Sequence, residues 1–430
     1  MEIALTIGFA VVFFLLIMVS VGLHEIGHMV PARIFGVRVP QYFIGFGPRI
    51  FSRTVGETEY GLKAFPLGGY VRLLGMYPPA SPHKGRRSRL GEFADEARAV
   101  EWDEITDKDV HDQRLLFQKK TWQRIVIMAS GPAMNILVCF VLMWGVIGGY
   151  GTYQAQPVIA TVSACVKPAT TVDQTCGPAD PASPAAQAGL KPGDRVVAFN
   201  GVQISSYDQL TSLIRANLDG EARLQVIRDG VTIDLPVVHT MINQVADTWD
   251  PSATVAAGFM GVTPTSELVR GGPGDVIRTM GTMIGQSAVA LVKLPVSVWN
   301  VVVDMVQGHP RSATSPMSIV GASWVAGEVV TADGVAWQAK LVMFAMLLAS
   351  INLFLAVFNL VPLPPLDGGH IAGAVYDRLR RAAAKLAHRK DPGPFDTAKL
   401  LPVAYGVTAF LLICGVALIV ADIVSPLALT

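Results

Sequence analysis

Four long apolar stretches constrain the fold of this 430-residue chain more than any other feature. They cover residues 3–23, 125–150, 341–366 and 400–421, and each reaches the length of about 20 residues that a helix needs to cross a hydrocarbon core. Charged residues make up only 16% of the chain, against about 25% in an ordinary globular domain. The sequence therefore predicts an α-helical polytopic membrane protein with about four spans. The net charge of +1 gives no reason to expect a nucleic-acid partner.

The distribution of lysine and arginine predicts the orientation, because short loops rich in these residues stay in the cytoplasm. Residues 32–124 hold 16 of the 34, residues 371–399 hold 7, and the long region 152–335 holds only 10. The first and third loops are expected to be cytoplasmic, and the central region and both termini to be outside. The first stretch lacks a basic leading segment and a cleavage pattern, so we expect it to be retained.

The connecting regions differ in character. Strand-like segments punctuated by glycine follow the first stretch at 42–48, 60–65 and 67–71, and they predict hairpins. Residues 78–112 are polar and charged, with Lys84, Arg86, Arg87 and Arg89 clustered, which predicts a flexible cytoplasmic insert whose role stays open. Three charged residues interrupt the apolar segment 274–305, so we expect an amphipathic surface helix there rather than a fifth crossing.

The central region contains a compact pattern between residues 183 and 201. It predicts a short helix, a tight turn and a strand that ends in the hairpin dipeptide Asn200-Gly201. Cys165 and Cys176 lie in the same region, where a disulfide could persist outside the cell, and their pairing stays open. Cys139 and Cys414 lie within apolar stretches and are expected to be small buried side chains.

The end of the first apolar stretch carries the strongest chemical motif. His24-Glu25-Ile26-Gly27-His28 matches H-E-x-x-H, in which two histidines four residues apart share one helical face and can reach one metal ion. Zinc is the expected ion. Ionisable side chains at membrane depth cost about 2.5–3.5 kcal/mol each, so three together indicate a function rather than an idle helix end.

A catalytic zinc usually takes three protein ligands and leaves one position open, so a third ligand is needed. Asp367 is the candidate, because it follows three prolines that break the third apolar stretch and precedes Gly368-Gly369-His370. Backbone broken in this way is tolerated in a membrane only where it lines a cavity or packs in protein. His370 is expected to contact a zinc ligand rather than the zinc itself, or to have no role at the site, because three protein ligands already suffice.

Together these motifs resemble the site-2 protease family, in particular the bacterial branch that degrades membrane-bound anti-sigma factors. The resemblance is carried by the histidine motif, by the segment from Asn359 to Gly368, by Gly131-Pro132 with Asn135, and by their order along nearly the whole chain. Residues 183–199 closely resemble a PDZ domain of the bacterial protease type. Several members carry two such domains in tandem, whereas this chain has one.

The resemblance implies a role for each matching residue. His24, His28 and Asp367 would bind one Zn²⁺ per chain, and Glu25 would be the general base. Substrate-binding positions would be Asn359, Pro362 and, in the hairpin segment between residues 56 and 75, Gly68 and Gly69. The PDZ domain would bind peptide through Gly258, Phe259, Met260 and Gly261. Partners would be the lipid bilayer and single-span membrane proteins such as anti-sigma factors already trimmed by another protease.

These expectations divide the chain into eight parts of a protein of the bacterial inner (plasma) membrane, with an extracytoplasmic PDZ domain and an active site towards the cytoplasm. The membrane-embedded parts are helix 1 (1–31), helix 2 (121–150), helix 3 with its Leu-Asp-Gly motif (339–367) and helix 4 (400–424). The remaining parts are the loop with a membrane-associated β-hairpin (32–120), the PDZ domain (155–265), a linker with an amphipathic helix (266–338) and a cytoplasmic loop (368–399).

Alternatives remain at this stage. A membrane metalloprotease with a distant glutamate as third ligand would share the histidine motif but would not need Asp367. A catalytically inactive scaffold would have no need of Glu25, and a zinc transporter would need a polar path through several spans. The PDZ domain could bind a new C-terminus or exclude bulky ectodomains, and the sequence does not separate these two modes.

Overall fold

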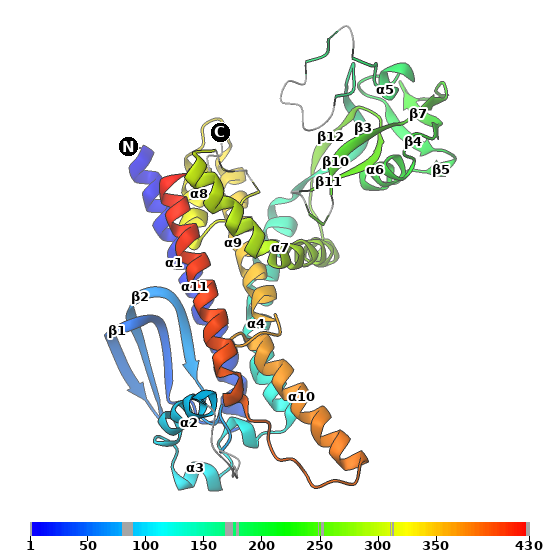
Figure 1. The fold of residues 1–430 in the computed structure, drawn as a ribbon. Coiled ribbons are helices and arrows are strands. Elements are labelled where there is room, and N and C mark those ends of the chain that lie inside the picture. The colour runs from blue at the N-terminus through cyan, green and yellow to red at the C-terminus, as the bar shows by residue number, and fades with distance from the viewer. Residues whose placement is uncertain are drawn as a thin grey trace. The chain divides into compact units, whose positions relative to one another are not determined.

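The computed structural model describes residues 2–79, 89–167, 175–177, 180–247, 249–250, 253–309, 311 and 314–426. The chain forms two compact units, one made of Met1–Met143 with Ile277–Thr430 and the other of Trp144–Val276. The first unit contains most of the apolar helices and a curled sheet, and the second is a mixed α/β unit (Figure 1).

The first unit is mainly helical. Its longer helices are α1 (Glu2–Ile34), α4 (Thr121–Trp144), α7 (Pro273–Gln307), α9 (Trp337–Asn359), α10 (Asp367–Leu386) and α11 (Leu401–Val424). Its shorter elements are α2 (Arg89–Trp102), α3 (Asp107–His111), η1 (Leu116–Gln118), α8 (Ile319–Thr331) and η3 (Thr397–Leu400). Its two strands are β1 (Gln41–Val55) and β2 (Thr58–Arg72).

Five helices in the described part of the chain are long and apolar enough to cross a membrane, against the four that the sequence predicted. The additional one is α7, which is long and apolar enough for a span although Lys293 lies near its middle. The amphipathic surface helix expected over residues 274–305 stays a prediction. On its inner side α7 packs against α11 through Val298, Val301 and Leu418.

A short helix that the sequence analysis missed, α8, packs along the N-terminal half of α1. A Cβ on Gly327 of α8 would lie 2.4 Å from the carbonyl oxygen of Thr6, so the two backbones nearly touch. Phe13 and Ile17 of α1 are buried in the same cluster as Ala326 of α8. Small residues allow this approach, as they do in many membrane helix pairs.

The third apolar stretch, expected as helix 3 over residues 339–367, is interrupted at its three prolines. Helix α9 ends at Asn359, and α10 begins at Asp367 (Figure 1). Prolines 362, 364 and 365 explain the break, because proline has no backbone N–H to donate and its ring clashes with the preceding turn. The predicted cytoplasmic loop 368–399 contains helix α10, and its place on the cytoplasmic side stays a prediction.

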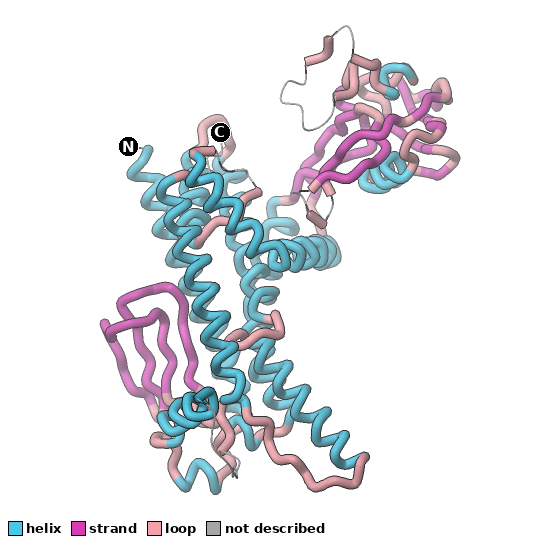
Figure 2. Tube along the Cα trace, in the orientation of Figure 1, coloured by secondary structure: helices cyan, strands magenta, loops and turns pink. Residues whose placement is uncertain are grey.

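The predicted hairpins are confirmed, and the two strands fold back on themselves into one curled sheet (Figure 2). Residues 41–44 pair with 69–72 on one side and with 59–62 on the other, and 51–55 pair with 58–62. Gly45 and Gly47 have φ of 90° and 85°, where β1 turns back. Residues 69–72, called the edge segment below, therefore form one edge of this sheet.

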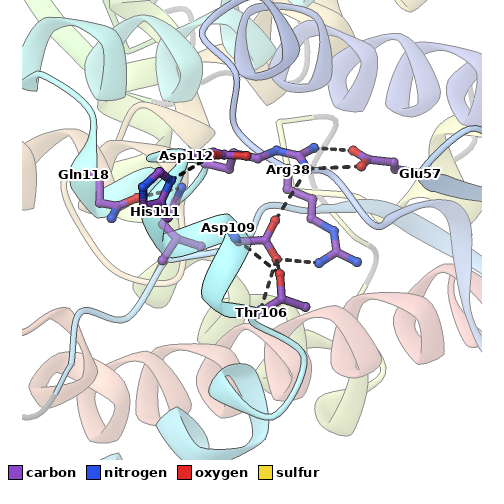
Figure 3. Close-up of polar contacts among 9 residues, drawn as sticks. Arg38, Glu57, Thr106, Asp109, His111, Asp112 and Gln118 are labelled. Atoms are coloured by element: carbon purple, nitrogen blue, oxygen red, sulfur yellow. Dashed lines mark hydrogen bonds and ion pairs between the residues drawn. The ribbon is translucent and has the colours of Figure 1, made fainter.

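The charged insert is ordered over residues 89–112, which corrects the prediction of a flexible loop; residues 80–88, with Lys84, Arg86 and Arg87, lie outside the described residues. Helix α3 begins with a capping box, in which Thr106 and Asp109 each bind the other's backbone N–H. Asp109 is buried and accepts a 2.7 Å bond from Arg38 (Figure 3). The charges pair with one another, which allows the segment to pack instead of remaining solvated.

The second unit contains a six-stranded sheet. Its main order is β12 (Val262–Val269), β3 (Thr152–Val162), β4 (Arg195–Phe199), β7 (Leu224–Arg228) and β8 (Val231–Asp234), and β5 (Val202–Gln203) pairs with β4. Two further pairs join β10 (Met241–Ala246) to β11 (Thr254–Phe259) and β6 (Glu221–Ala222) to β9 (Val238–His239). The helical elements are η2 (Gly145–Tyr150), α5 (Pro184–Gln187) and α6 (Tyr207–Ala216).

The local predictions for this unit are confirmed. Ser183 caps α5 by accepting from the Ala186 N–H, and β4 ends at a turn in which Asn200 and Gly201 both have positive φ. Leu210 of α6 and Phe199 of β4 are buried in one core beside the sheet. Cys165 and Cys176 form a disulfide, so the pairing that the sequence left open is resolved.

Candidate active site

The histidine motif lies on α1, where a continuous helix brings both imidazoles to one face. His24 is 8% exposed and His28 is 4% exposed. The Nδ1 of His28 lies 2.8 Å from the carbonyl oxygen of Ile127. Because a carbonyl can only accept, Nδ1 carries the proton and Nε2 keeps its lone pair for a metal ion.

Asp367 reaches the two histidines from the first residue of α10. Its Oδ2 lies 3.3 Å from the Nε2 of His24 and 3.3 Å from the Nε2 of His28, and these two nitrogens are 3.2 Å apart. Oδ2 is buried without a hydrogen-bond donor among the described residues. Atoms bound tetrahedrally to zinc at about 2.0–2.1 Å lie about 3.3 Å from one another, so the three atoms fit the ion.

Glycines allow the helices to approach this cluster. A Cβ on Gly131 of α4 would lie 2.2 Å from the Nε2 of His28, and one on Gly27 would lie 2.5 Å from the carbonyl oxygen of Ser130. Gly368 is similarly confined, with a Cβ 2.3 Å from the carbonyl oxygens of Leu360 and Val361. Gly131 thus makes room for the His28 ring, and Gly27 and Gly368 allow the backbones around the cluster to approach closely.

A cavity of about 360 Å³ opens beside the three ligands. Of the predicted site residues, it is lined by His24, Glu25, His28, Asp367, Asn359, Gly68 and Gly69, and also by His370. Pro362 is not among the lining residues. The group that could hold a metal ion, among the described residues, consists of His24, His28 and Asp367.

The edge segment forms one wall of the cavity. A Cβ on Gly69 would lie 3.2 Å from the Cγ of Glu25 and 3.3 Å from the Cγ1 of Val21, so its backbone lies directly on the α1 face that carries the motif. The hydroxyl of Tyr42 fixes the sheet on α1 by donating to the carbonyl oxygen of Gly22 at 2.9 Å. A backbone edge therefore runs beside the residue expected to be the base.

Several lining residues had no assigned role in the sequence. They are Val21, Tyr70, Val71, Leu73, Met76, Met128, Asn135, Leu355, Pro365 and Leu366. Asn135 is the notable one, because it is 1% exposed and its Oδ1 has no hydrogen-bond partner among the described residues. Its position, one helical turn after Gly131, could have indicated that it faces the same site.

The predicted peptide-binding residues lie in the second unit, around the end of β11. Met260 is 2% exposed and belongs to the core, while its carbonyl oxygen accepts from the Ala185 N–H at 2.9 Å. A Cβ on Gly258 would lie 2.1 Å from the carbonyl oxygen of Ile214, at the end of α6. Only the backbone of this segment could therefore contact a ligand at Gly258 and Met260.

The site is that of a zinc metalloprotease of peptidase family M50, in a chain whose apolar helices reach membrane-spanning length. Residues 12–390 match the model of peptidase family M50, and the chain belongs to this family. It is 33% identical to the zinc metalloprotease Rip1 of Mycolicibacterium smegmatis over 432 residues, covering 97% of this chain and 98% of that protein. It is 34% identical to Rip1 of Mycobacterium tuberculosis over 436 residues, again covering 97% and 98%.

Proposed function

We propose that this zinc metalloprotease cuts single-span membrane proteins within their transmembrane segments, with His24, His28 and Asp367 as zinc ligands. One observation carries the proposal: three ligand atoms 3.2–3.3 Å apart face a cavity whose wall is a sheet edge. His24 and His28 lie on the apolar helix α1, and Asp367 and the edge segment lie against it. A substrate helix that enters such a cavity must expose its backbone, and a sheet edge offers replacement hydrogen bonds.

The roles of the side chains follow from their places. When bound, zinc supplies the Lewis acidity that makes a water molecule nucleophilic near neutral pH and polarises the scissile carbonyl. Glu25, which lines the cavity beside the two histidines, takes the proton of the attacking water and passes it to the departing amine. Asn135 and Asn359 offer amide groups to the unwound substrate backbone, and the edge segment beginning at Gly69 binds that backbone as an added strand.

The second unit is proposed to control which substrates reach the active site. We propose that residues 155–265 act as an extracytoplasmic PDZ domain, supported by the resemblance of 183–199 and by the mixed α/β unit around them. The substrates would be anti-sigma factors trimmed by another protease. The disulfide of Cys165 and Cys176 supports an oxidising compartment for this unit, and the basic loops support a cytoplasmic side for the active site.

Cleavage of a single-span model substrate in proteoliposomes tests the activity, with the cut bond located by mass spectrometry. The proposal predicts a cut within the apolar segment and none in a soluble peptide that carries the same flanking sequence. A cut confined to the soluble flanks would contradict an intramembrane site.

Deletion of residues 155–265 tests the role of the PDZ domain separately. If this domain restrains access, the deleted protein cuts an untrimmed substrate that the full chain leaves intact. An untrimmed substrate that stays intact in both proteins would remove the support for gating.

A further inference from the structure

Residues 75–77 follow the edge segment after Leu73 and Leu74 and form the next part of the cavity rim. Leu73 and Met76 line the cavity itself. Glu101 of α2, which is 7% exposed, accepts hydrogen bonds from three successive backbone amides of this rim. The distances are 2.8 Å to Gly75, 2.9 Å to Met76 and 3.0 Å to Tyr77.

The carbonyl oxygens of the same segment are held from other directions. Trp102 Nε1 donates to the Tyr77 carbonyl at 3.2 Å, and Arg98 Nε donates to the Pro78 carbonyl at 2.9 Å. Thr397 Oγ1, at the start of η3, donates to the Met76 carbonyl at 2.7 Å. We call these four side chains the rim clamp: Arg98, Glu101, Trp102 and Thr397.

The rim clamp is itself anchored. Arg98 forms ion pairs with Asp95 and with Asp396, the latter at 2.7 Å, so α2 is joined to the segment that precedes α11. Gly75 has a φ of 82°, and a Cβ there would lie 2.5 Å from the Cβ of Leu115. The rim backbone therefore has a turn that favours glycine, and side chains outside the sheet bind its polar groups.

Contacts of this kind fix the position of a backbone. A buried carboxylate that accepts three amides makes charge-assisted bonds, and these are about twice as strong as neutral ones. None of the clamp residues belongs to the group that could hold the metal ion, and none lines the cavity. The clamp can therefore affect substrate binding without touching the zinc ligands.

We propose that Glu101 is a positioning residue for proteolysis: through the rim clamp, α2 holds residues 73–77 and the edge segment where the unwound substrate backbone is bound. This inference rests on the proposed function, because it takes the edge segment to be the substrate-binding strand. It gives the charged insert, whose role the sequence left open, a function in substrate binding.

Steady-state cleavage of the single-span substrate in proteoliposomes tests the inference, with zinc content and thermal unfolding measured on each protein. Glu101→Ala should raise KM about tenfold, since three bonds to the rim are lost together, while kcat changes less and zinc stays at the native level. The KM of Glu101→Gln should lie between those of the native protein and Glu101→Ala, because an amide oxygen can still accept hydrogen bonds from part of the rim. Glu96→Ala, which removes an exposed carboxylate from the same helix, should match the native protein.

The outcomes separate this inference from the proposed function. Cleavage by the native protein with an unchanged KM in Glu101→Ala, or a loss of zinc or kcat without a change in KM, would overturn the role of Glu101 and leave the protease intact. Absence of cleavage by the native protein would instead count against the proposed function.

Two milder variants keep the test decisive if Glu101→Ala does not fold. Trp102→Phe and Thr397→Val each remove one bond to a rim carbonyl, and each should raise KM by about two- to threefold at native zinc content. Native KM values in both would overturn the inference.

Discussion

The imidazole of His28 packs against Gly131, where there is no space for a side chain. A methyl group on Gly131 would lie 2.2 Å from the Nε2 of His28, which is the atom placed to bind zinc. Gly131→Ala should therefore displace this ligand and weaken zinc binding by tenfold or more, the scale seen when groups that orient metal ligands are lost. Zinc titration of metal-free protein measures this. Gly415→Ala, at a position with open space, should bind zinc normally, and native affinity in Gly131→Ala would contradict the packing.

Asn135 offers a test of a different kind, because its Oδ1 is buried without a partner. An unpaired buried polar group costs stability, so Asn135→Leu should keep or raise the melting temperature while kcat/KM falls about tenfold or more. Asn352→Leu is the control, because the Oδ1 of Asn352 is also buried without a partner while its Nδ2 donates to Ser20 Oγ at 3.1 Å and to the Leu348 carbonyl at 2.9 Å. Loss of those two bonds should lower the melting temperature. A less stable Asn135→Leu protein with native kcat/KM would show that Asn135 has only a structural role.

At this scale much of the site could be predicted from the sequence. The spacing of His24 and His28 fixes a shared helical face whatever the rest of the fold, and the prolines before Asp367 indicate backbone that needs a cavity. The role of Gly131 beside His28 and the unpaired Oδ1 of Asn135 could not be predicted, because they depend on the distance between α1 and α4. Pro362 was expected among the substrate contacts and does not line the cavity.

At the scale of elements, α3 illustrates how a charged segment becomes ordered. Burial alone would raise the pKa of Asp109, but hydrogen bonds from Thr106 and Arg38 lower it below its usual value. A carboxyl with a folded-state pKa below its unfolded value of about 3.9 stabilises the fold above that pH, and this stability is lost as the pH falls through the folded pKa. The charged form of Asp109 therefore stabilises the native protein at neutral pH.

Asp109→Asn should lower the free energy of unfolding by about 1–3 kcal/mol at pH 7, because a buried hydrogen-bonded charge is replaced by a weaker partner. The difference in melting temperature between native and variant proteins should shrink as the pH falls below about 4. Thermal unfolding from pH 7 to 3 measures this, with Asp112→Asn, a partly exposed carboxylate of the same region, as the control. A difference that is constant with pH would contradict the assignment.

Some secondary-structure elements could be predicted from the sequence and others could not, for physical reasons. Hairpins and the strand that ends at Asn200-Gly201 depend on local turn residues, and they were found. The insert looked flexible because its charges find partners far along the chain, as Arg98 does with Asp396, and the sequence pattern does not show such partners. Helix α8 is only 13 residues long, too short for a span, so it gave no signal of its own.

At the scale of the whole molecule, the orientation across the membrane is the main prediction. Thiol labelling in intact cells tests it, since Cys139 and Cys414 are buried and Cys165 and Cys176 are joined. An impermeant reagent should label Thr232→Cys and leave Lys390→Cys unlabelled until the membrane is opened. The reverse pattern would place the second unit in the cytoplasm and contradict the charge argument.

The proposed protease needs both the three zinc ligands and the base Glu25, and one measurement tests them together. Bound zinc is counted in the native protein and in Glu25→Gln, and each is assayed for cleavage of the single-span substrate. We predict one zinc per chain in both proteins and cleavage by the native protein alone, because glutamine leaves the ligands in place but cannot accept the proton. A native protein without zinc, or a Glu25→Gln protein that cleaves at the native rate, would contradict the account.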